Sequence, residues 1–164
     1  VLSPVGICII VCGGLLFWVG DHTLRFTGLS AVCAGEGEEA NPNYAGAGPH
    51  PIVVATELPQ QDGRYQVDIN TLREAWTPRF AHQTELILCL GAVETESVAE
   101  CGEGEDRIRV SRRADLYVVH TGQRIKSGRI VGDEPGPCGG EPGTEPDEAH
   151  LSEFVREFVE AKLP

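Results

Sequence analysis

The first 20 residues carry no charge, whereas all 38 Asp, Glu, Lys and Arg residues follow Gly20. About 20 residues of α-helix reach roughly 30 Å, the thickness of the hydrocarbon layer of a bilayer. The stretch is mostly apolar and has Trp18 near its end, where an indole ring prefers the headgroup region. We therefore expect residues 1–20 to form a transmembrane anchor that contacts membrane lipid. A cleaved signal peptide and a buried core helix are the alternatives.

The rest of the chain carries the whole net charge of −12, from 25 acidic and 13 basic side chains. This balance argues against a general nucleic-acid binder, because such proteins need a cationic surface to neutralise phosphates. An aromatic content of 6% also argues against a surface for stacking on single-stranded nucleic acid. We expect no nucleic-acid partner.

Residues 21–50 show no sustained hydrophobic periodicity. They contain an acidic, Gly-containing run at residues 35–39 and the segment Gly46-Ala47-Gly48-Pro49, which are typical of turns and linkers. Such a composition predicts a flexible linker over 21–50. It would hold a folded domain, residues 51–164, away from the bilayer.

Residues 51–164 are expected to form a small α+β domain. Short strands are predicted near Ile52 and Tyr65, a central strand over 86–90 from its unbroken apolar run, and a half-buried strand over 108–118 from its alternation. With a last strand ending near Val131, these elements predict a small antiparallel β-meander. Five apolar residues at helical spacing predict a C-terminal amphipathic helix that packs on the sheet and is capped by Thr144 or Asp147: Leu151, Phe154, Val155, Phe158 and Val159.

The cysteines suggest one disulfide. A hairpin that turns around Thr95 would place Cys89 and Cys101 opposite each other, so we predict a Cys89–Cys101 disulfide, with two reduced thiols as the alternative. Cys138 either pairs with Cys33 or stays free. A zinc site is a further possibility, although the short Cys-x-x-Cys and His-x-x-x-His spacings are missing, so no metal and no cofactor is expected. Its ligands would be Cys89, Cys101, Cys138 and His150.

Residues 107–129 form a basic segment in an acidic chain, with six Arg and one Lys against Asp115 alone. Guanidinium groups bind carboxylate and phosphate bidentately, so the segment predicts a site for an anionic ligand or an acidic protein partner. The alternative is internal charge balance with Glu94, Glu96, Glu100 and the acids of the C-terminal helix. The candidate ligand-binding residues are Arg107, Arg109 and Arg113, on one face of a strand by parity, and Arg124 on the partner strand.

Sequence motifs for catalysis are missing: there is no phosphate-binding Gly-rich loop, no Gly-x-Ser-x-Gly and no His-Glu-x-x-His. The leading hypothesis is a membrane-anchored envelope protein whose soluble domain lies outside the cytoplasm and acts as a non-enzymatic interaction or structural module. The alternative is a small extracytoplasmic hydrolase or ligand-binding domain. Its site would lie under the Pro/Gly loop at residues 132–143, where a His meets Cys138, a Ser or a carboxylate. No catalytic residue is assigned.

The order of several segments is similar to that of a group of uncharacterised exported or membrane-anchored bacterial domains of unknown function. The resemblance covers residues 84–160. It rests on Leu86-Ile87-Leu88-Cys89, an acidic hairpin to Cys101, a basic strand, Asp115 to Gln123, Pro135-Gly136-Pro137-Cys138 and a terminal helix. It implies an envelope location and a cysteine-bearing sheet, and it carries over no site.

Overall fold

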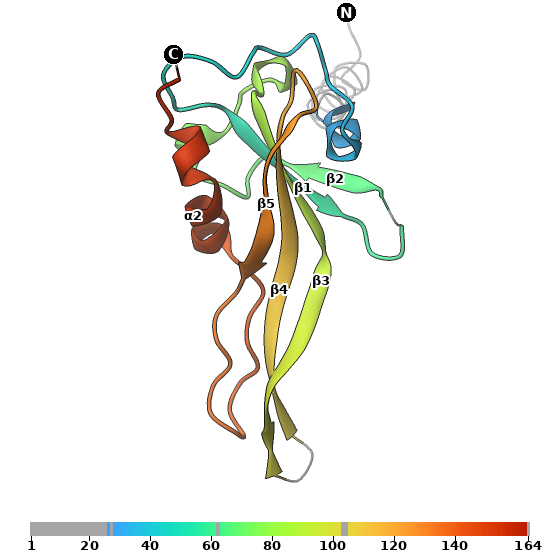
Figure 1. Ribbon diagram of the computed structural model, residues 1–164, viewed down its shortest axis with the longest axis vertical. Coiled ribbons are helices and arrows are strands. Elements are labelled where there is room, and N and C mark those ends of the chain that lie inside the picture. Colours follow the sequence, from blue (N-terminus) through green and yellow to red (C-terminus); the bar gives the residue numbers. More distant parts are fainter. Residues whose placement is uncertain (1–25, 27, 62, 103–104, 164) are drawn as a thin grey trace, which may run out of the picture.

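The computed structural model describes residues 26, 28–61, 63–102 and 105–163. They form a small α+β fold around one five-stranded sheet in the order β2-β1-β3-β4-β5. The helix α2 (Glu148–Val159) covers one face of the sheet, and the 3-10 helix η1 (Gly28–Ala34) packs on the other (Figure 1). The remaining elements are β1 (Ile52–Glu57), β2 (Tyr65–Asp68), η2 (Glu74–Trp76), η3 (Ala81–Gln83), β3 (Leu86–Cys101), β4 (Glu105–Val118) and β5 (Arg124–Val131).

The predicted membrane anchor, residues 1–20, lies outside the described residues. Within the described ranges, none of the helices has the length and apolar character needed to cross a bilayer.

The sheet is mixed, whereas the sequence predicts an antiparallel meander. β1 pairs parallel with β3, with Ile52 opposite Leu86, and antiparallel with β2. Parallel neighbours need a long crossover, because the chain must return to the starting end of the first strand. Residues 58–85, which include β2, η2 and η3, provide that crossover. The meander is confirmed for β3, β4 and β5, which are antiparallel neighbours, and is wrong for β1.

The first part of β3 is buried on both faces, as its unbroken apolar run predicts. Leu86, Leu88 and Leu90 belong to the core between the sheet and α2. Ile87 and Cys89 point to the opposite face and pack in a second core with η1. Alternate residues of a strand point to opposite faces, so one short segment supplies both cores.

Residues 28–50 belong to the folded unit, although they lie in the predicted flexible linker. Leu29 and Val32 of η1 are buried in the second core together with Phe26. Leu29 and Val32 are three positions apart, which is the period of a 3-10 helix, so they share one face of η1. The following segment is also fixed, since the Glu38 backbone N–H donates to the Val119 carbonyl at 2.8 Å.

β3 and β4 extend beyond the rest of the sheet as a two-stranded arm, residues 95–101 and 105–110 (Figure 1). The chain reverses between Cys101 and Glu105, which are paired in register, and the predicted reversal around Thr95 is wrong. The Glu94 to Cys101 segment continues β3, because the side chains from Glu94 to Ser97 are exposed to water and polar residues suit those positions. Two register shifts in β3, between Leu90 and Val93 and between Ser97 and Ala99, accompany this extension.

The described residues form two disulfides, Cys33–Cys89 and Cys101–Cys138. The predicted Cys89–Cys101 pair is wrong, because the later chain reversal puts Cys89 opposite Asp115 and leaves Cys101 at the arm's tip. The first disulfide joins η1 to β3, and the second joins the Pro/Gly loop to the arm. Disulfides persist in oxidising compartments, so the two bonds point to an extracytoplasmic environment.

The C-terminal helix is confirmed at the predicted position. Leu151, Val155 and Val159 of α2 are buried against the sheet, while Phe154 and Phe158 are partly buried at its border. Asp147 is the N-cap, and its side chain accepts hydrogen bonds from the backbone N–H groups of Ala149 and His150.

Candidate functional site

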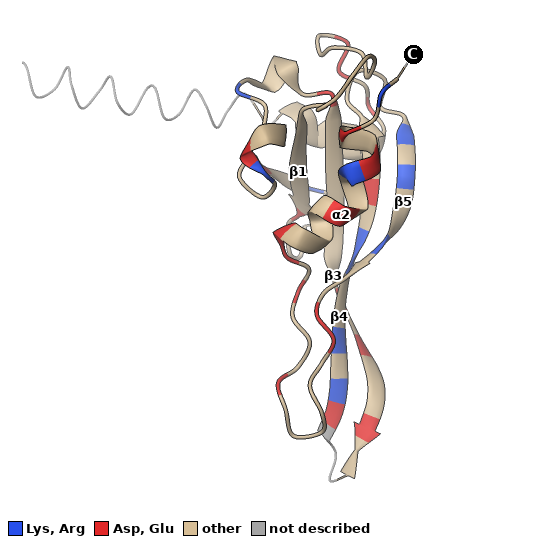
Figure 2. Cartoon of the chain, turned by 90° about the vertical axis from the view of Figure 1, so that its left-hand side faces the viewer, with Lys and Arg blue, Asp and Glu red and all other residues tan. Residues whose placement is uncertain are grey.

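The basic segment forms a charged surface on the η1 side of the sheet, beyond the area that η1 covers. The β4–β5 register places Arg113 opposite Arg129, and Tyr117 opposite Arg124. Asp115 lies between Arg113 and Tyr117 at the same parity, so its side chain shares their face. We call Arg113, Asp115, Arg124 and Arg129 the Arg face. The basic residues of β5 appear as blue bands along that strand in Figure 2.

One carboxylate orients two guanidinium groups on the Arg face. Asp115 accepts a hydrogen bond from Arg113 Nε at 3.1 Å and one from Arg124 Nη1 at 3.4 Å. The Asp115 side chain is 12% exposed, whereas the Arg113 and Arg124 side chains are 61% and 50% exposed. Exposed ion pairs stabilise a fold by less than about 1 kcal/mol, so the main effect of Asp115 is to hold the two arginines in position.

The two oriented arginines keep unused hydrogen-bond donors. Within the described part of the chain, Arg113 uses only Nε and Arg124 only Nη1. The paired Nη groups of Arg113 are the fork that binds a carboxylate or phosphate bidentately. With one carboxylate for two guanidinium groups, the trio has a net charge of +1. This arrangement can therefore accept an anionic group from solvent.

Two further side chains border the trio. Arg129 forms an ion pair with Glu94 of β3 at 2.8 Å, which confirms one contact of the predicted internal charge balance. Burial raises the pKa of Tyr65, nearby Glu57, Tyr117 and Asp115 raise it further, and Arg113 opposes them. The Tyr65 hydroxyl therefore stays protonated at neutral pH and can donate a hydrogen bond.

Arg107 and Arg109 do not join the Arg face, although they have the same parity on β4. Arg107 donates from Nε to the Gly136 carbonyl at 2.8 Å and from Nη2 to the Pro135 carbonyl at 2.9 Å. Arg109 forms an ion pair with Glu134 at 2.9 Å. Both side chains are directed to the Pro/Gly loop, residues 132–143, and hold it against the arm.

A cavity of about 260 Å³ lies beneath the Pro/Gly loop, where the sequence suggests an alternative enzymatic site. Its walls include Cys101, Asp106 and Arg107, together with the loop residues 135–137 and 139–142. Cys138, one of the residues that the alternative site would place beside a His, is a disulfide sulfur and carries no thiol. Three residues of the alternative zinc set, Cys89, Cys101 and Cys138, are in disulfides and offer no thiolate ligand.

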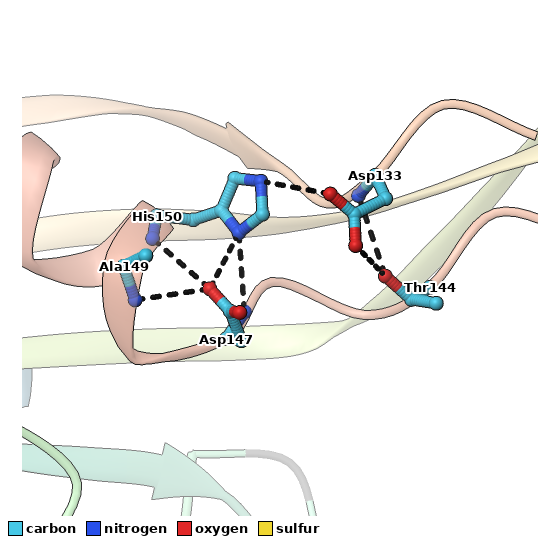
Figure 3. Close-up of polar contacts among 5 residues, drawn as sticks. All are labelled: Asp133, Thr144, Asp147, Ala149 and His150. Atoms are coloured by element: carbon cyan, nitrogen blue, oxygen red, sulfur yellow. Dashed lines mark hydrogen bonds and ion pairs between the residues drawn. The ribbon is translucent and has the colours of Figure 1, made fainter.

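His150 meets two carboxylates at the end of the Pro/Gly loop (Figure 3). Its Nδ1 lies 2.7 Å from Asp147 and its Nε2 lies 3.7 Å from Asp133. Thr144 donates its hydroxyl to Asp133 at 2.9 Å. In a nucleophile–base pair the hydroxyl is hydrogen-bonded to the imidazole, and the imidazole is hydrogen-bonded in turn to a carboxylate. Here the hydroxyl and the imidazole each contact carboxylates instead. The cluster ties the two ends of the loop together and caps α2.

The cap also affects the acidity of Asp147. The backbone N–H of His150, then its side chain, and the backbone N–H of Ala149 stabilise the charged carboxylate and lower the pKa of Asp147.

Sequence reasoning missed a buried polar pair at the start of two central strands. His50 Nδ1 lies 2.6 Å from Glu85 Oε2, and the His50 side chain is 2% exposed. His50 Nε2 faces the Ala161 carbonyl at 3.3 Å, and the Tyr44 ring contacts the imidazole edge-on. In the sequence, His50 and Glu85 each come just before an apolar strand. This pattern predicts their contact only when the two strands are known to pair in parallel.

Comparison with known proteins provides no assignment: no protein-family model, no curated protein and no solved structure matches this chain significantly.

Proposed function

We propose that this protein is a non-enzymatic interaction module of the cell envelope that binds an acidic protein partner through the Arg face. The supporting observation is that Asp115 orients two half-exposed guanidinium groups, Arg113 and Arg124, whose remaining donors are open to solvent. Recognition groups that are already oriented lose less side-chain entropy on binding than free ones.

The charge of the whole chain favours binding of an acidic partner at the Arg face over the rest of the surface. The net charge of −12 repels an acidic partner from most of the surface. The Arg113–Asp115–Arg124 trio, at +1, is an exception to that background. Electrostatic complementarity of this kind contributes more to specificity than to raw affinity.

The proposed setting is the outer side of a membrane, with residues 1–20 as the anchor. The two disulfides support the oxidising compartment. The uncharged, apolar composition of residues 1–20 supports the anchor.

A labelled oligoglutamate peptide tests the proposal, with an oligolysine peptide of the same length as the probe control. We expect saturable binding of oligoglutamate at low salt and weaker binding at high salt. The Arg113→Ser/Arg124→Ser double variant is expected to weaken binding about tenfold or more, since charge-assisted hydrogen bonds are lost.

The matched control is Arg64→Ser/Arg79→Ser, which removes the same charge from exposed positions outside the Arg face. It should bind oligoglutamate with an affinity close to that of the wild type. Equal losses in the two double variants would show a general charge effect and overturn the proposal, as would unchanged binding by the Arg113/Arg124 variant.

A further inference from the structure

Among the described residues, β5 is the last strand of the sheet, so one of its edges has no neighbouring strand from that part of the chain. In Figure 2, β5 lies at the margin of the sheet, and no described element is drawn beyond its outer side. An unpaired strand edge presents backbone N–H and C=O groups that can pair with another extended chain.

The hydrogen bonding with β4 identifies which residues present these groups. The Gly132 N–H donates to the Val110 carbonyl, and residues of an antiparallel pair alternate between bonded and non-bonded positions. Gly128 and Ile130, in the same register as Gly132, therefore bond to β4. The backbone groups of Ser127 and Arg129 point outward.

The outer edge of β5 is more regular than the other open edges of the sheet. From Ser111 opposite Val131 to Leu116 opposite Lys126, the register with β4 is uninterrupted. The distal edge of β3 has two register shifts and carries Glu94, Glu96 and Glu100, whereas β2 has only four residues. A regular edge can form consecutive backbone hydrogen bonds with an incoming strand, whereas an irregular or short edge cannot.

The side chains beside this edge define the partner's chemistry. Arg129 lies in the regular part of β5 and on the Arg face, so a strand added at the edge places its alternate side chains next to it, while Arg124 reaches the same face from beyond the register shift between Leu116 and Tyr117. Glutamate or aspartate at those positions would meet guanidinium groups. A second copy of this chain would instead bring arginines against arginines, which repel each other.

We propose that the outer edge of β5 accepts an extended acidic segment of the partner protein as a sixth strand. This inference rests on the proposed function and specifies how the partner binds: backbone hydrogen bonds to Ser127 and Arg129 give affinity, and carboxylates on the Arg face give specificity.

The test uses a synthetic peptide of alternating glutamate and threonine, with a lysine–threonine peptide as its control. Two further peptides carry N-methyl groups on alternate amides: one on the odd-numbered residues and the other on the even-numbered residues. In an added strand only one of these two sets of N–H groups points to β5 and donates to it. We therefore expect the peptide methylated on that set to bind about tenfold more weakly than the other. Equal affinities of the two N-methylated peptides would overturn the inference.

Ser127→Pro provides the matching change in the protein, with Ser127→Ala as its control. Proline at position 127 removes an outward N–H and no bond to β4, and proline is tolerated at strand edges. We expect Ser127→Pro to lose about tenfold in affinity for the glutamate–threonine peptide while its thermal midpoint stays close to that of Ser127→Ala. If Ser127→Pro binds as well as Ser127→Ala while Arg113→Ser/Arg124→Ser does not, strand addition is wrong and the proposed function stands. Dimerisation through β5 in place of peptide binding would also overturn the inference.

Discussion

Cys33 is bonded to Cys89 across 56 positions of the chain, and the bond fastens η1 to the middle of the sheet. η1 is a short 3-10 helix with a few buried side chains, Leu29 and Val32 among them. The position of this helix therefore depends on the disulfide as well as on packing.

Replacing Cys33 and Cys89 by serine should lower the free energy of unfolding by about 4 kcal/mol, because the unfolded chain regains the entropy of a long loop. Amide hydrogen exchange should accelerate most in η1. The control is Cys101→Ser/Cys138→Ser, which opens a loop of 37 positions and should cost a similar free energy while leaving exchange in η1 slow. Equally fast η1 exchange in both variants would contradict a local role for the Cys33 bond.

Gly122→Ala should destabilise the protein for two reasons. Gly122 has a φ of 67°, which favours glycine, and a Cβ at this position would collide with the Gly35 carbonyl. The expected loss in the free energy of unfolding is about 2–3 kcal/mol, measured by urea denaturation. Gly46→Ala separates the two effects, since Gly46 has a φ of 84° and open space around its Cβ position. It should cost about 1 kcal/mol, and a cost equal to that of Gly122→Ala would show that the contact with Gly35 is unimportant.

His50→Ala should remove about 3 kcal/mol of stability, because it leaves the Glu85 carboxylate, itself largely shielded from water, without its nearest partner. The exposed His82 is the control, and His82→Ala should change stability by about 0.5 kcal/mol or less. In His50→Gln/Glu85→Gln both members of the pair are neutral amides, so this variant should recover part of the loss. Failure of His50→Ala to destabilise more than His82→Ala would show that the pair is not structural.

The Asp147 cap of α2 should make the free energy of unfolding fall at low pH. The folded pKa of Asp147 is lowered, so its contribution is present above the unfolded carboxyl pKa of about 3.9 and is lost as the pH falls through the folded pKa. Asp147→Ala should therefore have a lower thermal midpoint than the wild type at pH values near neutral, with a smaller difference under strongly acidic conditions. Asp147→Asn keeps a capping acceptor without the charge, so its deficit should be smaller. A deficit of Asp147→Ala that does not change with pH would contradict the role of the charge.

The sequence predicted correctly those strands and helices whose hydrophobic pattern lies within one continuous segment. The apolar run at 86–90 and the helical spacing from Leu151 to Val159 are of this kind. The parallel pairing of β1 with β3 joins residues 34 positions apart, such as Ile52 and Leu86, and nothing in either strand specifies its neighbour. The disulfide prediction failed for a similar reason, since Thr95 and the Gly102 region both allow a chain reversal and only the folded sheet distinguishes them.

The candidate site was also predictable in part. Strand parity placed Arg113 on one face, and Arg124 joined it there through the pairing of β4 with β5. The same parity rule assigned Arg107 and Arg109 to that surface, but the Pro/Gly loop has no periodic pattern and its position beside β4 could not be foreseen.

The ends of the described chain lie far from the tip of the arm. η1 and the C-terminus are at one pole of the elongated molecule, where the Leu163 N–H bonds to the Gly46 carbonyl, and the β3–β4 tip is at the other (Figure 1). A label or fused domain attached at the C-terminal end of the described chain would therefore lie far from the tip. Fluorophores placed at the C-terminus and at Ser97 would report bending of the arm as a change in energy transfer.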